Sequence, residues 1–407
     1  MNCRNCHHPL EQVFLDLGFA PPSNAYRLKE ELNKPELTYP LRILVCNGCW
    51  LVQTEDFVEA GELFNPTYAY FSSTSTSWLE HAEKYFDMIQ KKLALNAESL
   101  VLEVASNDGY LLKNFVEAGI PCLGIEPTDS TAHASEQLGV PVLREFFGME
   151  MGNRLAAEGK QADLIIGNNV YAHVPDINDF TSGLKAALKQ GGTITLEFAY
   201  IFYLIKKTLF DIVYHEHYSY LSLYNVQQIF DKADLKVLDV EELPTQGGSL
   251  RVYGTHSDDP RPVSAHVEEQ LRKEESSGLR EMETYKRFQP RVDKVKDSLI
   301  LFLIEQKRRG KCVAAYGAAA KGNTLLNYAG IKPDLIPFVC DAAPSKQGKF
   351  LPGSRIPICS PIELRRRKPN ILVILPWNIA EEVVGQHDYV REWGGQFVTL
   401  VPDLRFL

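Results

Sequence analysis

Apolar runs of strand length alternate with helical segments along the middle of this chain. The runs span residues 100–104, 122–125, 164–167 and 193–198, and a helical pattern over 78–95 precedes them. This rhythm is typical of a parallel sheet with crossover helices. Two further strand-like runs, 235–240 and 249–253, close the block.

The same alternation returns near the C-terminus after a stretch of a different kind. Residues 263–309 are rich in Glu, Lys, Arg, Leu and Gln, with few helix breakers, which predicts long connecting helices. Strand-like runs then follow at 312–316, 336–340, 371–376 and 397–401. They predict a second, smaller α/β domain.

The length of 407 residues exceeds what one hydrophobic core organises. We therefore divide the chain into a small N-terminal unit (1–75), a central α/β domain (76–262), a helical linker (263–309) and a C-terminal α/β domain (310–407). The fold class is α/β, with both larger domains expected to be Rossmann-like. The N-terminal unit is short, aromatic and bounded by cysteine pairs.

Charge and hydropathy exclude several classes of partner. A net charge of -9 argues against a nucleic-acid partner, and the one basic run, 365–368, is interpreted as the solvated end of an element. No stretch approaches the ~20 apolar residues that span a bilayer, and the start lacks the apolar core of a signal peptide. We expect no membrane partner and a cytoplasmic location. Since thiols stay reduced there, the cysteines are interpreted as metal ligands or core residues.

Two cysteine pairs of C-x-x-C spacing predict a structural zinc site. The pairs are Cys3 with Cys6 and Cys46 with Cys49. Two such knuckles offer four thiolates to one tetrahedral Zn²⁺, which leaves no open position for catalysis. A redox pair or plain core cysteines are the alternatives.

A small-residue loop follows the first strand of the central domain. Its sequence, Glu-Val-Ala-Ser-Asn-Asp-Gly at 103–109, allows a ligand to approach the backbone at a helix N-terminus. Nicotinamide enzymes require G-x-G-x-x-G, and only Gly109 is present. Glu103, placed in the loop, and Glu126, after the next strand, suit a ligand with a cationic amino-acid end and ribose hydroxyls.

This order resembles the class I S-adenosylmethionine methyltransferases, in which an acidic residue after the second strand accepts both ribose hydroxyls. The resemblance implies that Glu126 binds the ribose, although Ala105 and Asn107 stand where the usual loop has glycines. Phe147, in a Phe pair, could flank adenine, and Asn168 closes the fourth strand at the edge where ligands bind. Taken singly, a Phe pair is more often core and an Asn pair more often turn chemistry.

Residues 211–220 concentrate two histidines, a carboxylate and three tyrosines. Burying so many polar side chains together is energetically unfavourable unless they have a binding or catalytic role. His215 and His217 are two apart and thus do not form the zinc-protease motif; in an extended segment they would share one face. His173, just past the fourth strand, could reach the same place, and a structural role for it is equally open.

The whole chain resembles the nucleotide-sugar C-methyltransferases, the C-3'-methyltransferases of 4-keto-6-deoxyhexose pathways. The motifs that carry the resemblance are Tyr-x-Tyr-x-Ser-Ser at 68–73, Tyr-x-Glu-His at 214–217, Gly-Gly-Ser-Leu-Arg at 247–251 and Tyr-Gly-Ala-x-Ala-Lys at 316–321. The resemblance implies an N-terminal zinc domain, a central S-adenosylmethionine-dependent methyltransferase domain and a C-terminal α/β domain. It also implies that His217 is the base and that Tyr68, His173, Tyr214 and Glu216 line the reaction centre.

The C-terminal domain is predicted to bind the nucleotide sugar. Its loop at 316–322 lies between a strand and a helix and fits a diphosphate. The expected contacts are Tyr316, Lys321, Lys346 and Asn378. A domain that merely packs against the first is the alternative, and the nucleotide, dTDP, GDP or CDP, stays open.

Two other functions fit parts of the sequence. A zinc-ribbon methyltransferase acting on RNA or protein would need a basic patch and has no use for the second α/β domain. A non-catalytic nucleotide-sugar-binding scaffold leaves the 214–217 cluster unexplained.

Overall fold

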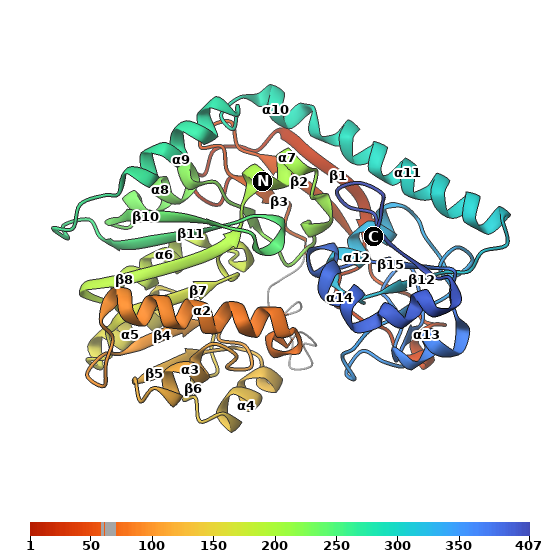
Figure 1. Ribbon diagram of the computed structural model, residues 1–407. Coiled ribbons are helices and arrows are strands. Elements are labelled where there is room, and N and C mark those ends of the chain that lie inside the picture. The colour runs from red at the N-terminus through yellow and green to blue at the C-terminus, as the bar shows by residue number, and fades with distance from the viewer. Residues whose placement is uncertain (58–60, 62–70) are drawn as a thin grey trace.

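The computed structural model describes residues 1–57, 61 and 71–407 (Figure 1). Within these residues the strands form three sheets. The N-terminal sheet is antiparallel and has the order β1 (Gln12–Ala20), β2 (Tyr39–Val45), β3 (Val52–Thr54) and β9 (Ser219–Tyr220). Since β9 lies far along the chain, the N-terminal unit is completed by a strand from the central region.

The central sheet has the order β10-β11-β8-β7-β4-β5-β6. Its strands are β4 (Val101–Val104), β5 (Cys122–Ile125), β6 (Val142–Leu143), β7 (Ala162–Asn168), β8 (Leu188–Ala199), β10 (Leu235–Leu243) and β11 (Ser249–His256). The first five in chain order are parallel, as predicted, and the β10–β11 hairpin adds an antiparallel edge.

Helices cover both faces of this sheet because its strands are apolar on both sides. Along β7, Leu164 and Ile166 pack with the helices of one face, while Ile165 joins the core of the other. The first face carries α2 (Thr76–Leu93) and α3 (Leu112–Glu117). The other helices of this part are α4 (Asp129–Gln137), α5 (Met149–Ala157), α6 (Ile177–Ala187), α7 (Ile201–Lys207) and α8 (Leu223–Lys232).

The C-terminal sheet has the order β14-β13-β12-β15-β16-β17 and is parallel except for β17. Its strands are β12 (Val313–Tyr316), β13 (Val339–Cys340), β14 (Ile358–Cys359), β15 (Ile371–Ile374), β16 (Gln396–Thr399) and β17 (Arg405–Phe406). Its helices are α12 (Ala320–Tyr328), α13 (Ile362–Arg367) and α14 (Ala380–His387). The basic run at 365–368 is exposed at the end of α13, as interpreted from the sequence.

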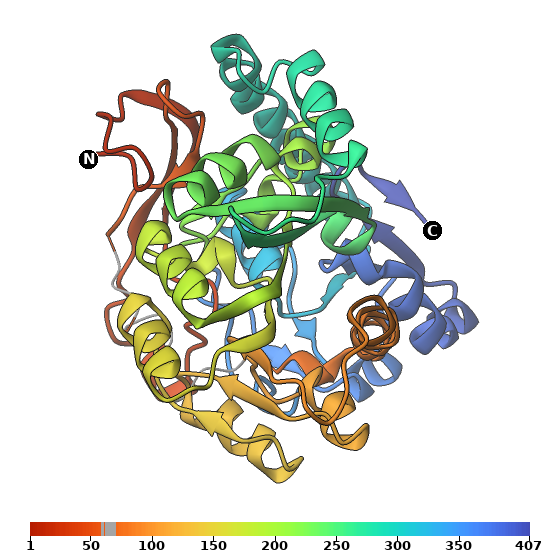
Figure 2. The ribbon, with the colours of Figure 1, turned by 90° about the vertical axis from the view of Figure 1, so that its left-hand side faces the viewer.

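The predicted connecting helices are α9 (Ala265–Ser276), α10 (Met282–Lys286) and α11 (Phe288–Arg308), which arch from the central part to the C-terminal part (Figure 1). Phe288 stacks on Phe14 of β1 with ring centroids 4.7 Å apart. The connecting helices therefore also pack against the N-terminal sheet. In Figure 2 this sheet lies on the same side of the molecule as the N-terminus.

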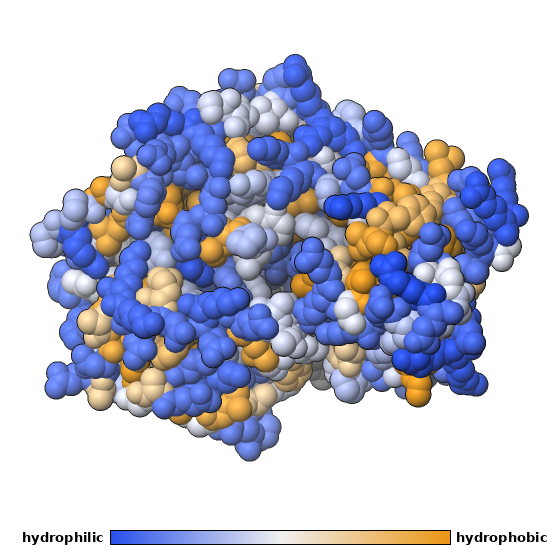
Figure 3. Space-filling view, viewed as in Figure 1, coloured by the Kyte–Doolittle hydropathy of each residue, from blue (hydrophilic) through white to orange (hydrophobic). Residues whose placement is uncertain are grey.

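Hydrophilic side chains cover most of the face shown in Figure 3. A search of the described residues finds no helix that is both long and apolar enough to cross a membrane.

Candidate functional site

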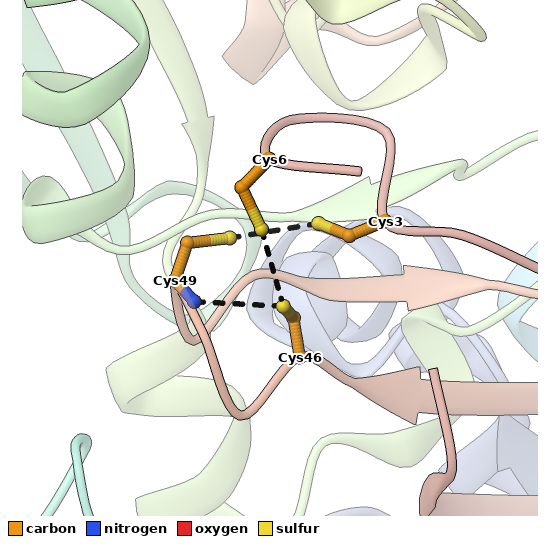
Figure 4. A group of neighbouring side chains, drawn as sticks. All are labelled: Cys3, Cys6, Cys46 and Cys49. Atoms are coloured by element: carbon orange, nitrogen blue, oxygen red, sulfur yellow. Dashed lines mark hydrogen bonds between the residues drawn. The ribbon is translucent and has the colours of Figure 1, made fainter. Parts of the chain in front are cut away.

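The four predicted zinc ligands come together in one cluster. The Sγ atoms of Cys3, Cys6, Cys46 and Cys49 all lie within 4.8 Å of one another and point inward (Figure 4). The Cys3–Cys49 and Cys6–Cys46 sulfur pairs are each 3.5 Å apart. A Zn–S bond of about 2.3 Å in a tetrahedron requires sulfurs slightly under 4 Å apart, roughly this spacing.

Hydrogen bonds to sulfur favour a thiolate at Cys3, while the hydrogen bonds with Cys3 raise the pKa of Cys46 and Cys49. The backbone amides of Gly48 and Cys49 point at the Cys46 Sγ from 3.3 and 3.5 Å, and the Gln53 side chain donates to Cys3 Sγ at 3.3 Å. Hydrogen bonds from Cys46 and Cys49 hold the pKa of Cys3 below its ordinary value. Since metal ligands must be deprotonated, the donor set fits Zn²⁺.

A cavity of about 660 Å³ joins the two α/β parts. Its walls include the carboxyl edge of the central sheet, the 214–217 cluster and the carboxyl edge of the C-terminal sheet. The predicted site residues that line it are Ala105, Asn107, Glu126, Phe147, Asn168, His173, Tyr214, Glu216, His217, Tyr316, Lys321, Lys346 and Asn378. Tyr68 falls outside the described residues.

The loop after β4 adopts a glycine-like course without the usual glycines. Ala105 and Asn107 have φ values of 56° and 51°, in the left-handed region, and Gly109 has 76°. The side chains of the loop also hold the next segment, since Asn107 Oδ1 accepts from the amide of Ser72 at 2.9 Å. The loop therefore turns through the left-handed region at two non-glycine residues, which strains the backbone at Ala105 because this residue carries a Cβ.

Glu126 lies at the end of β5 with its carboxylate next to this loop. The amide of Asn107 donates to one oxygen at 3.0 Å, and the amide of Thr128 donates to the other at 3.0 Å. The hydroxyl of Thr128 also donates to this second oxygen, and the carboxylate, which lines the cavity, retains acceptor capacity on its first oxygen. Phe147 packs edge-on against Phe180, with centroids 5.3 Å apart, and lines the same end.

Glu103 lies elsewhere than the sequence suggested. It is not in the loop but within β4, is 1% exposed and is absent from the cavity wall. Burial, with Asp108 and Glu126 nearby, raises its pKa well above the ordinary value. The carboxyl therefore holds its proton more tightly than an exposed one, and it does not line the cavity in which we expected it to meet a cationic ligand. Gly109 is likewise absent from the residues that line the cavity, and it lies against Ser135 where the backbone turns.

The 214–217 segment forms a turn rather than an extended strand, with the amide of His217 donating to the carbonyl of Tyr214 at 2.9 Å. The turn is fixed from both sides, because the amide of Tyr218 binds Ala172 and its carbonyl accepts from Thr54. As a result the two histidines diverge. The expectation that they share a face is wrong: His215 Nε2 lies 3.2 Å from the carbonyl of Pro40, away from the cavity that His217 lines.

His217 is held as a neutral imidazole with a defined tautomer. Its Nδ1 lies 2.7 Å from the carbonyl of Ile212, which can only accept, so Nδ1 carries the proton and Nε2 the lone pair. Burial lowers its pKa well below the ordinary value, with contributions from His173 and Lys321. Its ring lies 4.6 Å from that of His173 and 4.0 Å from that of Tyr214. The group can therefore accept a proton at neutral pH.

The C-terminal edge is built around Asp341. Its carboxylate accepts from the amides of Ala318 and Ala343 at 2.7 and 2.8 Å and pairs with Lys346 at 3.5 Å. Lys321, in the first turn of α12, donates to Asn378 Oδ1 at 3.0 Å. Two ammonium groups and a helix N-terminus thus face the cavity from this side.

Sequence reasoning missed residues that join the three parts. Asn24, from the N-terminal unit, donates to Glu216 at 2.7 Å, and Gln246 accepts from Lys321 at 2.5 Å. Trp78 forms part of the wall beside Tyr110. Only Gln246 had a signal, since it directly precedes the Gly-Gly-Ser-Leu-Arg motif.

The arginine of that motif belongs to a buried ionic network. Arg251 donates to Glu197 at 2.8 Å, and Glu197, which is fully buried, also binds His81 and Thr245. These hydrogen bonds and charges lower the pKa of Glu197 against the effect of its burial. The network ties α2 to the strands that end at the cavity.

A Rossmann-like methyltransferase sheet and a four-cysteine cluster, joined to a second α/β part by one cavity, define this class of protein. Family models match along the chain: "Putative zinc binding domain" at 3–64, "Methyltransferase domain" at 78–240 and "C-methyltransferase C-terminal domain" at 244–402. The C-methyltransferase NovU of Streptomyces niveus is 33% identical over 405 residues, which cover 100% of this chain and 96% of NovU. The chain belongs to the C-methyltransferase family and is an S-adenosylmethionine-dependent C-methyltransferase.

Other similarities are partial. An uncharacterized methyltransferase of Mycobacterium leprae (strain TN), ML2584, is 28% identical over 99 residues, 24% of this chain and 36% of that protein. The magnesium protoporphyrin IX methyltransferase of Synechocystis PCC 6803, solved with bound S-adenosylmethionine, has a TM-score of 0.33 and 15% identity; the match covers 44% of this chain and 82% of that one.

Proposed function

We propose that the protein methylates carbon 3 of a nucleotide-linked 4-keto-6-deoxy sugar. The observation that carries the proposal is the single cavity in which the central sheet edge, His217 and the cationic edge of the C-terminal sheet meet. A reaction between two ligands bound at opposite edges needs its base near both. His217 lines this cavity beside His173 of the central part, and Lys321 of the C-terminal part is near enough for its charge to lower the pKa of His217. Positioning of this kind supplies much of an enzyme's rate.

The chemistry follows from the state of His217. A carbonyl acidifies the neighbouring C–H, and the free Nε2 lone pair is the acceptor for that proton. The carbonyl of Ile212 fixes the ring, so the lone pair has one direction. When bound, S-adenosylmethionine supplies an electrophilic methyl group to the carbanion at carbon 3. His173, Tyr214 and Glu216, which line the cavity with His217, would surround this centre. The role of Tyr68 stays a prediction from the sequence.

The remaining residues divide between two ligands. Glu126, Asn107, Ala105, Phe147 and Asn168 would hold the cofactor, with Glu126 accepting from the ribose hydroxyls. Tyr316, Lys346, Asn378 and Lys321 would hold the nucleotide sugar. A zinc ion on Cys3, Cys6, Cys46 and Cys49 would have a structural role, because four thiolates close its coordination.

A cavity shared by both sheets favours a small substrate with two parts, a nucleotide and a sugar, over an RNA or protein substrate. It also favours an enzyme over a non-catalytic scaffold. The test is incubation of the protein with S-adenosylmethionine and a panel of dTDP-, GDP- and CDP-linked 4-keto-6-deoxyhexoses. Mass spectrometry should find a gain of one methyl group on one member, and NMR should place it on carbon 3. No methylation of any member, by protein that binds S-adenosylmethionine, would refute the proposal.

A further inference from the structure

Helix α12 places Lys321 beside the reaction centre rather than only at the nucleotide end. The hydroxyl of Thr324, one turn on, donates to the carbonyl of Val213 at 2.7 Å. The helix also packs closely on η4 (Phe210–Ile212), the element that leads into the His217 turn. The charge of Lys321 is close enough to His217 to lower the pKa of its imidazole.

Two neutral acceptors bind the Lys321 ammonium group, which leaves its third N–H group for another acceptor. Nζ donates to Gln246 Oε1 at 2.5 Å and to Asn378 Oδ1 at 3.0 Å, and it lies 5.1 Å from the centre of the Trp377 ring. An ammonium has three N–H groups. In the part of the chain that the structure describes, no hydrogen bond is found for the third, and the side chain lines the cavity.

The acceptor Gln246 sits on a strained backbone. Its φ and ψ are 54° and 22°, in the left-handed region, and Gly247 and Gly248 that follow also have positive φ. A Cβ on Gly247 would lie 2.3 Å from the Trp377 ring, so this loop is fitted closely against the C-terminal part. Strain in a non-glycine residue persists where surrounding structure enforces it, often at functional sites.

A buried carboxylate completes the surroundings of Lys321. Asp211 is 1% exposed and accepts from Trp377 Nε1 at 2.6 Å. Burial lowers the pKa of Lys321 to about 8, and Asp211 opposes this shift. Since this value lies above 7, the group is a cation at neutral pH, and its partial burial limits its solvation. Poorly solvated charges stabilise nearby opposite charges strongly.

We propose that Lys321 is a catalytic residue that stabilises the enolate oxygen during carbon-3 methylation, with Gln246 and Asn378 as the residues that position it. The inference rests on the function proposed above. When the C3–H bond breaks, its proton goes to His217 Nε2 and its electron pair forms a C3=C4 bond, so the charge moves to the carbonyl oxygen. The third N–H of Lys321 donates to that oxygen. As the C3–CH₃ bond forms and the S–CH₃ bond breaks, the carbonyl is restored, and Lys321 keeps its proton throughout.

Lys346 is the contrasting cation and the matched control. It donates to the carbonyl of Ala318 and pairs with Asp341, and its ammonium lies 5.6 Å from the Tyr26 ring. These contacts place it at the loop after β12. It is the better candidate for the diphosphate.

The experiment compares Lys321→Met, which keeps the length of the side chain, with Lys346→Met. It uses the panel member that the wild type methylates and, for binding, the matching free nucleoside diphosphate. We expect Lys321→Met to lose about 10²–10³ in kcat, the usual cost of one oxyanion donor, with unchanged diphosphate affinity by calorimetry. Lys346→Met should lose diphosphate affinity and raise KM. In Lys321→Ala, added ethylammonium should restore part of the turnover, whereas it should not help Lys346→Met.

Two results would overturn the assignment. One is a Lys321→Met enzyme with wild-type kcat and weakened diphosphate binding, which would make Lys321 a phosphate ligand. The other is loss of both properties without ethylammonium rescue. If the wild type methylates no panel member, the proposed function itself fails, whatever the lysine variants do.

Discussion

The two α/β parts of this molecule share one arrangement at the carboxyl edges of their sheets. In each, an acidic residue at the end of the second strand binds the backbone of the loop after the first strand: Glu126 accepts from Asn107 at 3.0 Å, and Asp341 accepts from Ala318 at 2.7 Å. Each also accepts from the amide two residues further on. In both parts the carboxylate therefore holds the loop after the first strand through the same pair of hydrogen bonds.

The difference lies in charge and in how the loop turns. Asp341 pairs with Lys346, while no ion pair to Glu126 is found among residues 1–57, 61 and 71–407. The central loop turns through Ala105 and Asn107, whereas the C-terminal loop turns at Gly317, where a Cβ would lie 2.4 Å from Pro376. The central edge therefore suits a cationic cofactor, and the C-terminal edge suits an anionic diphosphate. A variant at one edge should then weaken one ligand and spare the other, which can be tested.

The largest effect should come from the zinc cluster, because the N-terminal sheet supports both edges at once. Cys46→Ser should remove zinc and most of the stability, since structural zinc contributes about 10–16 kcal/mol of apparent binding free energy. Thermal unfolding and elemental analysis check this, with Cys312→Ser as the control. Binding of both ligands should fail together. A folded, active Cys46→Ser enzyme or wild-type protein free of zinc would contradict the structural-zinc assignment.

His217 lines the cavity that both sheet edges share, and its removal should leave ligand binding at both edges intact. His217→Ala should lower turnover by about 10²–10⁴, the usual contribution of a positioned base, while calorimetry finds both ligands still bound. His215→Ala should be milder because its ring binds the carbonyl of Pro40. Near-normal turnover in His217→Ala with an inactive His215→Ala would transfer the base role to His215.

Much of this arrangement follows from sequence periodicity, and the exceptions have physical causes. The parallel strands were predictable because apolar runs buried on both faces have a clear signal. The antiparallel edge strand β17 has no such apolar signal, since both of its residues are exposed. Zinc ligand spacing is a local property and was therefore visible, whereas the pairing of β9 with β3 is not local.

The site shows the same division. The turn at His217 escaped prediction because it depends on backbone bonds to Ala172 and Thr54, far away in sequence. Glu103 was misplaced by a single strand boundary, and that boundary decides whether the carboxyl is buried within β4 or exposed to the cavity. Gln246 acquires its role only when the two sheets share a cavity.

A pair of carboxylate variants should separate the two edges. Glu126→Ala should weaken S-adenosylmethionine binding about tenfold or more, through the loss of charge-assisted hydrogen bonds worth roughly 1.5–3 kcal/mol, and leave nucleotide affinity unchanged. Asp341→Ala should do the reverse. Calorimetry with each ligand on each variant forms the test. Equal loss of both ligands in either variant would mean that the carboxylates stabilise the whole cavity rather than one edge.

The smallest effect concerns the aromatic wall at the cofactor end. Phe147 packs its edge against Phe180 and lines the cavity, whereas Phe146 is 55% exposed, so only the Phe147 ring is held rigidly enough to stack on adenine. Aromatic pairs contribute about 0.5–1.5 kcal/mol beyond their buried area. Phe147→Leu should therefore weaken S-adenosylmethionine roughly 2- to 10-fold, and Phe146→Leu should leave it unchanged. Nucleotide affinity should stay constant in both variants, because these rings belong to the central edge. If Phe146→Leu weakened the cofactor and Phe147→Leu did not, adenine would stack on the exposed ring, and Phe147 would be part of the core with Phe180.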